Sequence, residues 1–153
     1  MKNKNAKRVL LLLTRLSMGW IFFYAGITKV LNPEWTAAGF LKGAKTFNGF
    51  YSWLASDGMI GFVNFLNEWG LTLLGVSLIL GALVKLSSYC GALLMLLYYF
   101  PSLDFPMAGA HSFLIDEHII YILLLLFFVF VKAGRIYGLD EKLEKMKFFE
   151  KLV

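Results

Sequence analysis

The residues most suited to chemistry in this chain lie at the start of its last apolar run. Asp116, Glu117 and His118 stand side by side, Tyr121 follows three residues after the histidine, and an apolar run continues to Val131. Histidine titrates near neutral pH and suits proton transfer, and buried carboxylates with raised pKa values can relay protons. Ionisable groups at the mouth of a membrane-length helix are costly to place there, so the pattern indicates a functional site.

Two earlier apolar runs carry ionisable side chains that can reach the same level. At a helical rise of about 1.5 Å per residue, Lys29 lies about 21 Å beyond Arg15 in the first run. In the second and fourth runs, Glu68 and His118 each lie about 24 Å from the opposite end of their helix. All three positions approach one boundary of a hydrocarbon layer roughly 30 Å thick, which predicts a cluster beneath an aromatic segment. The predicted catalytic residues are His118, Glu68 and Glu117, and the predicted substrate-binding residues are Lys29, Tyr121 and Trp35.

Each of these residues also has a structural interpretation that the sequence leaves open. Lys29 could extend its amine to the membrane surface, and Glu68 could be an interface residue. One of Asp116 and Glu117 could be a helix N-terminal acid favoured by the helix dipole, and His118 could be a packing histidine. No metal site is predicted, because the spacing of the histidines and acids matches no strong metal-binding pattern.

Membrane-length helices are the elements that must position these residues. The chain has 153 residues, of which 59% are hydrophobic and 16% charged, and its mean hydropathy is +0.68. Soluble domains average about 45–50% apolar and about 25% charged residues, and the excess here is gathered into runs long enough to cross a bilayer. We predict an all-α, multi-pass integral membrane four-helix bundle in the cell membrane. The predicted transmembrane domain is 1–138, with spans at about 9–31, 61–84, 87–103 and 113–131.

The first span carries its small and charged residues on one face. Arg15, Gly19, Phe22, Gly26 and Lys29 recur at steps of three and four. Glycines on such a face let another helix approach closely. We therefore expect both charges to point into the bundle, where the likeliest role of the arginine is structural, as a contact with the region of the aspartate at position 140 or with an anionic lipid.

The net charge of +5 reflects topology and does not indicate a nucleic-acid partner. Basic residues gather before the first span, between the second and third, and after the fourth, whereas the segment 32–61 is neutral and Asp104 makes the next connection acidic. This alternation follows the positive-inside rule and places the N- and C-termini in the cytoplasm. The basic residues concerned are Lys2, Lys4, Lys7, Arg8, Lys85, Lys132 and Arg135.

Two segments outside the spans are also expected to contact the membrane. The segment 32–59, between the first two spans, is rich in aromatic residues, which favour membrane interfaces, so we predict short interfacial helices over the mouth of the cluster. The tail 139–153 has apolar residues at helical spacing with Lys and Glu between them, which predicts an amphipathic helix on the cytoplasmic face. The one cysteine, Cys90, excludes an internal disulfide.

Four stretches of the sequence resemble the DoxX family. They are the opening helix 15–29, the segment 68–75 with Glu68 and Gly75, the Asp116-Glu117-His118 triplet, and the closing segment 133–140. The resemblance extends from about Leu11 to Asp140 and is greatest to the branch called DoxD, the membrane subunit of thiosulfate:quinone oxidoreductase.

The resemblance implies a four-helix membrane subunit of a quinone-linked oxidoreductase that converts thiosulfate to tetrathionate. It further implies membrane quinone as the electron acceptor and a second small redox subunit as partner, since no partner domain is fused to these spans. A non-catalytic membrane anchor or assembly partner for a redox protein, and a small-solute carrier that would need a homo-oligomer, are the alternatives.

Overall fold

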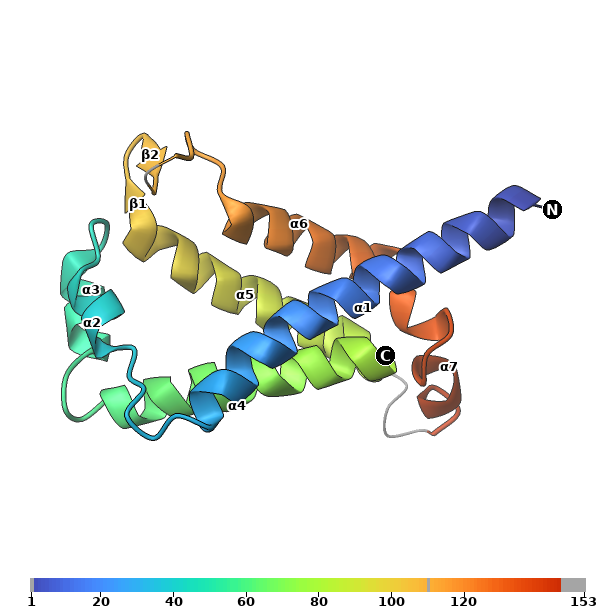
Figure 1. Cartoon of the computed structure of the whole chain (residues 1–153), viewed down its shortest axis with the longest axis horizontal. Coiled ribbons are helices and arrows are strands. Elements are labelled where there is room, and N and C mark those ends of the chain that lie inside the picture. Colours follow the sequence, from blue (N-terminus) through green and yellow to red (C-terminus); the bar gives the residue numbers. More distant parts are fainter. Residues whose placement is uncertain (1, 110, 147–153) are drawn as a thin grey trace.

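The computed structural model describes residues 2–109 and 111–146, and this part of the chain is mostly helical. Helix accounts for 70% of it, which confirms the predicted helical class. Its four longest helices are α1 (Lys2–Val30), α4 (Ile60–Leu80), α5 (Val84–Ser102) and α6 (Glu117–Phe130). α1 packs along α4, α4 contacts α5, and α5 packs along α6, so the long helices lie side by side (Figure 1).

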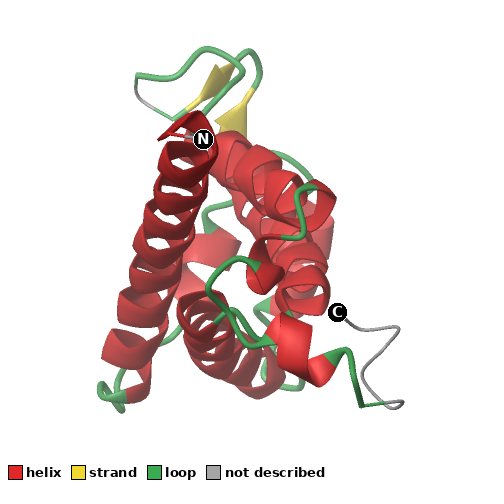
Figure 2. Ribbon diagram, turned by 90° about the vertical axis from the view of Figure 1, so that its right-hand side faces the viewer, coloured by secondary structure: helices red, strands yellow, loops and turns green. Residues whose placement is uncertain are grey.

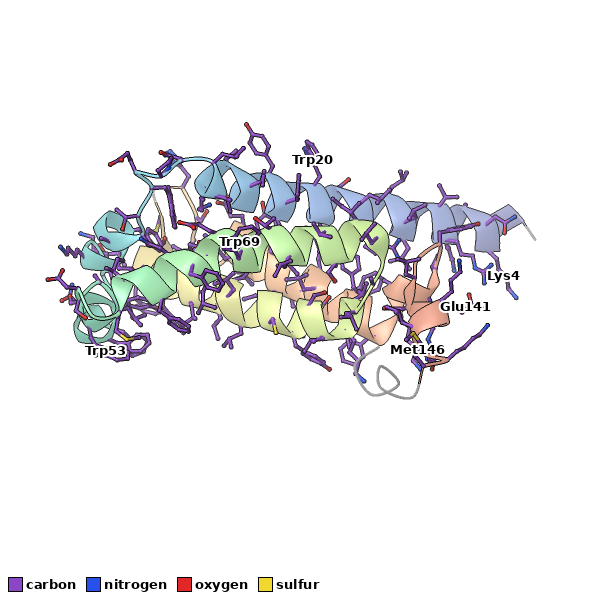
Figure 3. All side chains as sticks on the ribbon, turned by 90° about the horizontal axis from the view of Figure 1, so that it is seen from below. Lys4, Trp20, Trp53, Trp69, Glu141 and Met146 are labelled. Atoms are coloured by element: carbon purple, nitrogen blue, oxygen red, sulfur yellow. The ribbon has the colours of Figure 1, made fainter. Side chains whose placement is uncertain are left out.

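The short elements gather at the two ends of the long helices (Figure 1). One end, here named the hairpin end, holds α2, α3 and a two-stranded antiparallel sheet that Figure 2 shows outside the long helices. The other, here named the basic end, holds the start of α1, a 3-10 turn and α7. Figure 3 shows Trp53 at the hairpin end and Lys4, Glu141 and Met146 at the basic end. The bounds of the short elements are α2 Ala38–Lys42, α3 Asn48–Leu54, β1 Leu103–Asp104, β2 Met107–Ala108, the 3-10 turn Ala133–Arg135 and α7 Asp140–Leu143.

Glycines bring α1 and α4 into backbone contact, as the glycine face of the first span predicts. A Cβ on Gly26 would lie 2.3 Å from the backbone nitrogen of Thr72, and a Cβ on Gly75 would lie 2.3 Å from that of Phe23. Real side chains do not approach so closely, and glycine allows two helices to meet with their backbones nearly touching. This close pair forms one wall of the site described below.

The two later helices have ends set by local chemistry. α5 continues through Pro101 to Ser102, close to the predicted end at about 103. Proline has no N–H to donate to the carbonyl of Leu97, and this carbonyl accepts the Tyr51 hydroxyl at 3.0 Å instead. α6 begins at Glu117, later than the expected start at Phe113, because the Asp116 carboxylate caps the helix. At 14 residues, α6 is about 21 Å long.

The outward faces of the long helices are apolar. Within the described residues, the segments Lys4–Val30 and Ile60–Leu80 are long and apolar enough to cross a membrane, and α6 is a shorter apolar helix. Trp20 is 60% exposed on the outer side of α1 (Figure 3), and Phe130 is 84% exposed at the end of α6. Helices that are apolar both inside and outside are typical of membrane proteins.

Arg15 joins α1 to the segment that follows α6. Its side chain is only 1% exposed, and its guanidinium donates hydrogen bonds to the main-chain carbonyls of Ala133, Ile136 and Tyr137, the last two at 3.1 Å. Of the two roles predicted for this arginine, the structure therefore shows the contact with the region of Asp140. Arginine suits the task because its planar guanidinium presents several fixed donors.

Asp140 completes this network, which we name the Arg15–Asp140 network. Its carboxylate accepts hydrogen bonds from the backbone N–H groups of Leu83 at 2.6 Å and Val84 at 3.2 Å, so it caps α5 from across the chain. Burial raises the pKa of the Asp140 carboxyl above its ordinary value, against the lowering effect of these two hydrogen bonds and of the Arg15 charge. The network fastens the start of α5 and the segment after α6 together.

The tail is described only as far as Met146. α7 spans Asp140–Leu143, and Arg135 forms an ion pair with Glu144 just after it. The amphipathic helix predicted over 139–153 therefore begins as a short helix fastened to α4 and α5 through Asp140, and its residues 147–153 lie outside the described residues.

Candidate functional site

A cavity of about 270 Å³ lies between the long helices near the hairpin end. α1, α4, α5, α6 and the segment that leads into α2 all contribute to its wall. Its apolar lining comes chiefly from Phe22, Ala25, Phe40, Leu71 and Met95. Polar or ionisable groups project from three sides, which is the usual composition of a small-molecule site. These residues are Lys29, Trp35, Thr36, Tyr98, His118 and Tyr121.

Lys29 lines the cavity from the last turn of α1. Its ammonium group donates to the carbonyl of Ala25 at 2.7 Å and lies 5.3 Å from the centroid of the Trp35 ring. A cation within about 6 Å of an indole ring is attracted to its face. Trp35 therefore holds the lysine amine over the cavity, and the pair closes one side of it.

His118 lines the cavity from the first turn of α6, and Asp116 holds its ring. One oxygen of the Asp116 carboxylate accepts from the backbone N–H groups of His118 at 3.0 Å and Ile119 at 3.3 Å. The other lies 2.6 Å from Nδ1 of His118. With Nδ1–H donating to the carboxylate, Nε2 of the neutral ring is the acceptor. A single aspartate thus starts α6 and orients the imidazole.

Tyr98 of α5 stacks on the imidazole and ties it to α4. The two ring centroids are 5.8 Å apart with an angle of 19° between the planes. The Tyr98 hydroxyl donates to Oδ1 of Asn67, whose Nδ2 donates to the carbonyl of Val63 at 2.7 Å. A fully hydrogen-bonded polar network of this kind rigidifies the wall that carries it.

Tyr121 lies one helical turn beyond His118 on the cavity side of α6. Its ring meets that of Phe22 edge-on, with centroids 5.8 Å apart. Tyr121 and His118 therefore face the cavity together, three residues apart on one helix, as their spacing predicts.

Four of the six predicted site residues line this cavity, and two do not. Lys29, Trp35, His118 and Tyr121 are brought together from three parts of the chain. Glu117 is exposed at the start of α6. The half-buried Glu68 accepts through its main-chain carbonyl from the Thr72 hydroxyl at 2.6 Å, and its side chain is not part of the cavity wall. The chemical roles of all six residues remain predictions.

The sequence did not mark Asn67 as a site residue, and it pointed to Asp116 without fixing its role. Asn67 is buried on α4 and shares a helix face with the apolar residues Leu71 and Leu74, which follow it at helical spacing. This spacing could have predicted that Asn67 lies on the inner face of the helix. For Asp116, the analysis left open which of two neighbouring acids begins the helix, and the structure assigns that place to Asp116.

Among the described residues, no group of three His, Cys, Asp or Glu side chains is placed to hold a metal ion. The other histidine, His111, is exposed in the loop before α6. The polar groups that line the cavity are one imidazole with its carboxylate, one amine, two phenols, the Thr36 hydroxyl and the Trp35 indole.

Comparison with protein-family models identifies the family of this chain. The model of the DoxX family matches residues 10–114, more than half of the chain. The chain belongs to the DoxX family. Members of this family are generally membrane proteins, in accord with the apolar helices. Searches of curated proteins and of solved structures each found no match.

The DoxX match covers one part of the cavity wall. Of the cavity's lining, Lys29, Trp35 and Tyr98 lie within residues 10–114, and α6 with His118 lies beyond them. The family region thus supplies the amine, the indole and one phenol, and the following helix supplies the imidazole.

Proposed function

We propose that this DoxX protein is a four-span subunit of the cell membrane with both termini in the cytoplasm. The apolar outer faces of the long helices support insertion, since exposed apolar surface of this extent needs lipid. The basic residues 4, 7, 8, 132 and 135 belong to the N-terminal part of α1 and to the segment after α6, both at the basic end. By the positive-inside rule that end faces the cytoplasm, and the hairpin end faces outward.

Within this topology, the cavity at the hairpin end binds the ring of a membrane quinone. The observation that carries this proposal is one apolar cavity into which Lys29, His118 and Tyr121 all project. Its volume of about 270 Å³ is just below the roughly 300–1,000 Å³ of sites for drug-sized ligands, so it suits a single substituted ring. Donors from two separate helices, α1 and α6, match a ligand with two carbonyl oxygens on its ring.

The proton requirement of the reaction gives the imidazole its role. Reduction of a quinone to a quinol takes up two electrons and two protons. Coupling two thiosulfate ions through a new S–S bond to give tetrathionate releases two electrons and no protons, so the protons must come from protein groups and water. Asp116 holds the His118 ring through Nδ1, and Nε2 of the imidazolium donates a proton to a quinone oxygen.

The electron donor belongs to a complex of which this chain is the membrane subunit. Thiosulfate is the proposed donor, and a second small redox subunit is the proposed partner, both on the resemblance to the DoxD branch. Lys29 supports an anionic donor at the outward mouth, because its cationic amine, 5.3 Å from the Trp35 ring centroid, belongs to a residue that lines the cavity at this end. In this arrangement the exposed Glu117 exchanges protons between water and the Asp116–His118 pair.

The test is the quinone content of the purified protein. We expect about one quinone per chain in the organic extract of the wild-type protein, and at least a tenfold loss in His118→Ala. The matched control is His111→Ala, which removes the other, exposed histidine and should retain the quinone. The same variants in the intact complex should show whether thiosulfate-dependent quinone reduction follows the bound quinone.

Two results would contradict the proposal. A wild-type protein without quinone, when purified from quinone-containing membranes in mild detergent, would exclude a tight quinone site. Equal quinone in the wild type and in His118→Ala would move the ligand away from this cavity. Either result would favour the anchor or carrier alternatives, which need no electron acceptor.

A further inference from the structure

A second cavity, of about 280 Å³, lies at the basic end, far from the proposed quinone site. It lies between the start of α5 and the end of α6 and is closed by the 3-10 turn. One side is apolar and is formed by Phe128, Val129 and Phe130. The other side carries three cationic residues, Lys85, Lys132 and Arg135. The proposed redox function uses none of these groups.

The charge of this cavity is positive although acids lie close to it. Asp140 contributes to the wall, but its oxygens accept the backbone N–H groups of Leu83 and Val84 and it faces the Arg15 charge. Arg135 shares its guanidinium with Glu144 in an ion pair that is about one-third exposed. With three cationic residues and one carboxylate in its lining, the cavity carries a net positive charge and is complementary to an anion.

The apolar side shows what kind of anion fits. Phe130 is 84% exposed and continues the cavity wall onto the outer face of α6. A small soluble anion would gain nothing from this phenyl ring. A molecule with an anionic head and an apolar chain would place the head between the lysines and the chain along α6. Basic pockets between helices on the cytoplasmic side of a membrane have this composition when they bind anionic lipid head groups.

We propose that the cavity at the basic end is a binding site for the phosphate head group of an anionic phospholipid of the cytoplasmic leaflet. The proposal rests on the membrane topology given under Proposed function and is independent of quinone. Lys85 and Lys132 contact the phosphate, Arg135 contributes from the rim, and the acyl chains lie against Phe130. The bound lipid then bridges the start of α5 and the end of α6, the same two elements that the Arg15–Asp140 network joins from inside.

The experiment compares two double variants with equal charge change. Lys85→Gln with Lys132→Gln removes the two lysines of the cavity, and Lys42→Gln with Lys45→Gln removes two exposed lysines at the hairpin end. Each protein is placed in lipid nanodiscs of phosphatidylcholine with increasing phosphatidylglycerol. Lipid retained by the protein after mild detergent extraction is counted by native mass spectrometry, and the thermal unfolding midpoint is recorded.

We expect the wild type and the Lys42/Lys45 variant to retain about one phosphatidylglycerol per chain and to gain thermal stability as its fraction rises. The Lys85/Lys132 variant should retain at least tenfold less and gain little, because the positive charge that attracts the anionic head group is reduced. Inorganic phosphate added to protein in neutral detergent separates the two sources of the anion. An equal stabilisation by phosphate alone would mean a site for soluble phosphate and would overturn the lipid proposal.

The other outcomes are equally distinct. Equal retention by all three proteins would show that the two lysines form no site. A protein that does not enter the nanodisc would overturn both the topology and the lipid site. Quinone content, measured on the same samples, should not change in the Lys85/Lys132 variant, so failure of the lipid site and failure of the quinone site remain separate results.

Discussion

The hairpin end and the basic end each contain a buried aspartate that accepts two backbone N–H groups, and the two aspartates serve different purposes. Asp116 caps its own helix, and its second oxygen reaches an imidazole that faces a cavity. Asp140 caps α5 from a segment far along the chain and lies beside Arg15, whose guanidinium is bound to main-chain carbonyls. The Asp116–His118 pair leaves an imidazole facing a cavity, whereas the groups of the Arg15–Asp140 network bind other groups of the protein.

This difference shows how to separate a functional polar network from a structural one. The Arg15–Asp140 network joins elements distant in the sequence, so its loss should affect folding. The Asp116–His118 pair is local, so its loss should affect chemistry more than stability. The following predictions test this contrast, in order of decreasing effect on stability.

The largest effect is expected for Arg15→Met. Without the guanidinium, the buried carbonyls of Ala133, Ile136 and Tyr137 lose their donor, and the Asp140 carboxylate loses a nearby positive charge. Each buried polar group left without its partner typically costs about 1–3 kcal/mol, so the total should be about 3–5 kcal/mol. Thermal unfolding in detergent, followed by circular dichroism, measures the loss. Arg8→Met, at an exposed position of the same helix, should be close to the wild type. An equal effect of both variants would mean that the network does not hold this end together.

Gly134→Ala should destabilise the same network by steric overlap. An added Cβ would lie 1.8 Å from Oδ2 of Asp140, and overpacking of this kind costs about 1–3 kcal/mol. Gly39→Ala is the matched control at the hairpin end, because a Cβ there would have no neighbour within 4 Å. The unfolding midpoint should fall only for Gly134→Ala. A similar fall for Gly39→Ala would assign the effect to helix propensity or to the unfolded chain.

Tyr51 should make the hairpin end sensitive to alkali. Its side chain is 1% exposed and its hydroxyl donates to the carbonyl of Leu97 at 3.0 Å. Burial raises the pKa of the Tyr51 phenol above its ordinary value of 10.0. The unfolded chain therefore loses this proton at a lower pH than the folded chain. The stability that Tyr51 contributes is intact below pH 10 and is lost as the pH rises through and above that value.

Tyr51→Phe provides the comparison for this pH dependence. It should cost about 1 kcal/mol at neutral pH through the lost hydrogen bond, and its unfolding midpoint should decline less steeply than that of the wild type above pH 10. Parallel curves for the two proteins would show that the phenol does not titrate differently in the folded state.

The smallest change in stability and the largest change in chemistry are expected for Asp116→Asn. Asparagine is as good an N-cap as aspartate, so the free energy of unfolding should change by less than about 1 kcal/mol. An amide N–H facing Nδ1 would move the ring proton to Nε2 and remove the negative charge beside the ring, so quinone reduction by the intact complex should fall at least about tenfold. Nitrogen chemical shifts of the imidazole report the change of tautomer.

Glu117→Gln makes the same change of group one residue away, at the acid proposed to exchange protons with water. Its side chain is exposed, so water can take over this exchange, and quinone reduction should fall less than in Asp116→Asn. A larger loss in Glu117→Gln than in Asp116→Asn would make the outer acid the important one and would reverse the contrast between the two neighbours.

Much of the site at the hairpin end could be predicted because its geometry is repetitive. The fixed rise and period of an α-helix set the level of Lys29 and His118, and the spacing of three set the common face of His118 and Tyr121. Trp35 follows α1 so closely that it could only lie over the same end. The glycine face of α1 predicted its close packing in the same way, and the packing on α4 agrees.

Contacts between elements could not be predicted in this way. Tyr98 meets Asn67 across two helices, and neither residue is marked by a motif. The two short strands after α5 exist because they pair with each other, with Leu103 opposite Ala108. Each strand has only two residues, which is too short to show a periodic pattern in the sequence. Which of Asp116 and Glu117 caps α6 depends on which residue has an extended backbone conformation. Two adjacent acids in a sequence do not show this.

The sequence by itself determined that this protein is built from apolar helices with its basic residues at one end, because hydropathy and charge act through composition and position along the chain. Only the tertiary structure decided the partners of the buried polar groups. Arg15 binds main-chain carbonyls, which every residue carries, so no sequence pattern marks them. Likewise, the cavity that joins Lys29 to His118 exists only where helices from distant parts of the chain leave a space between them.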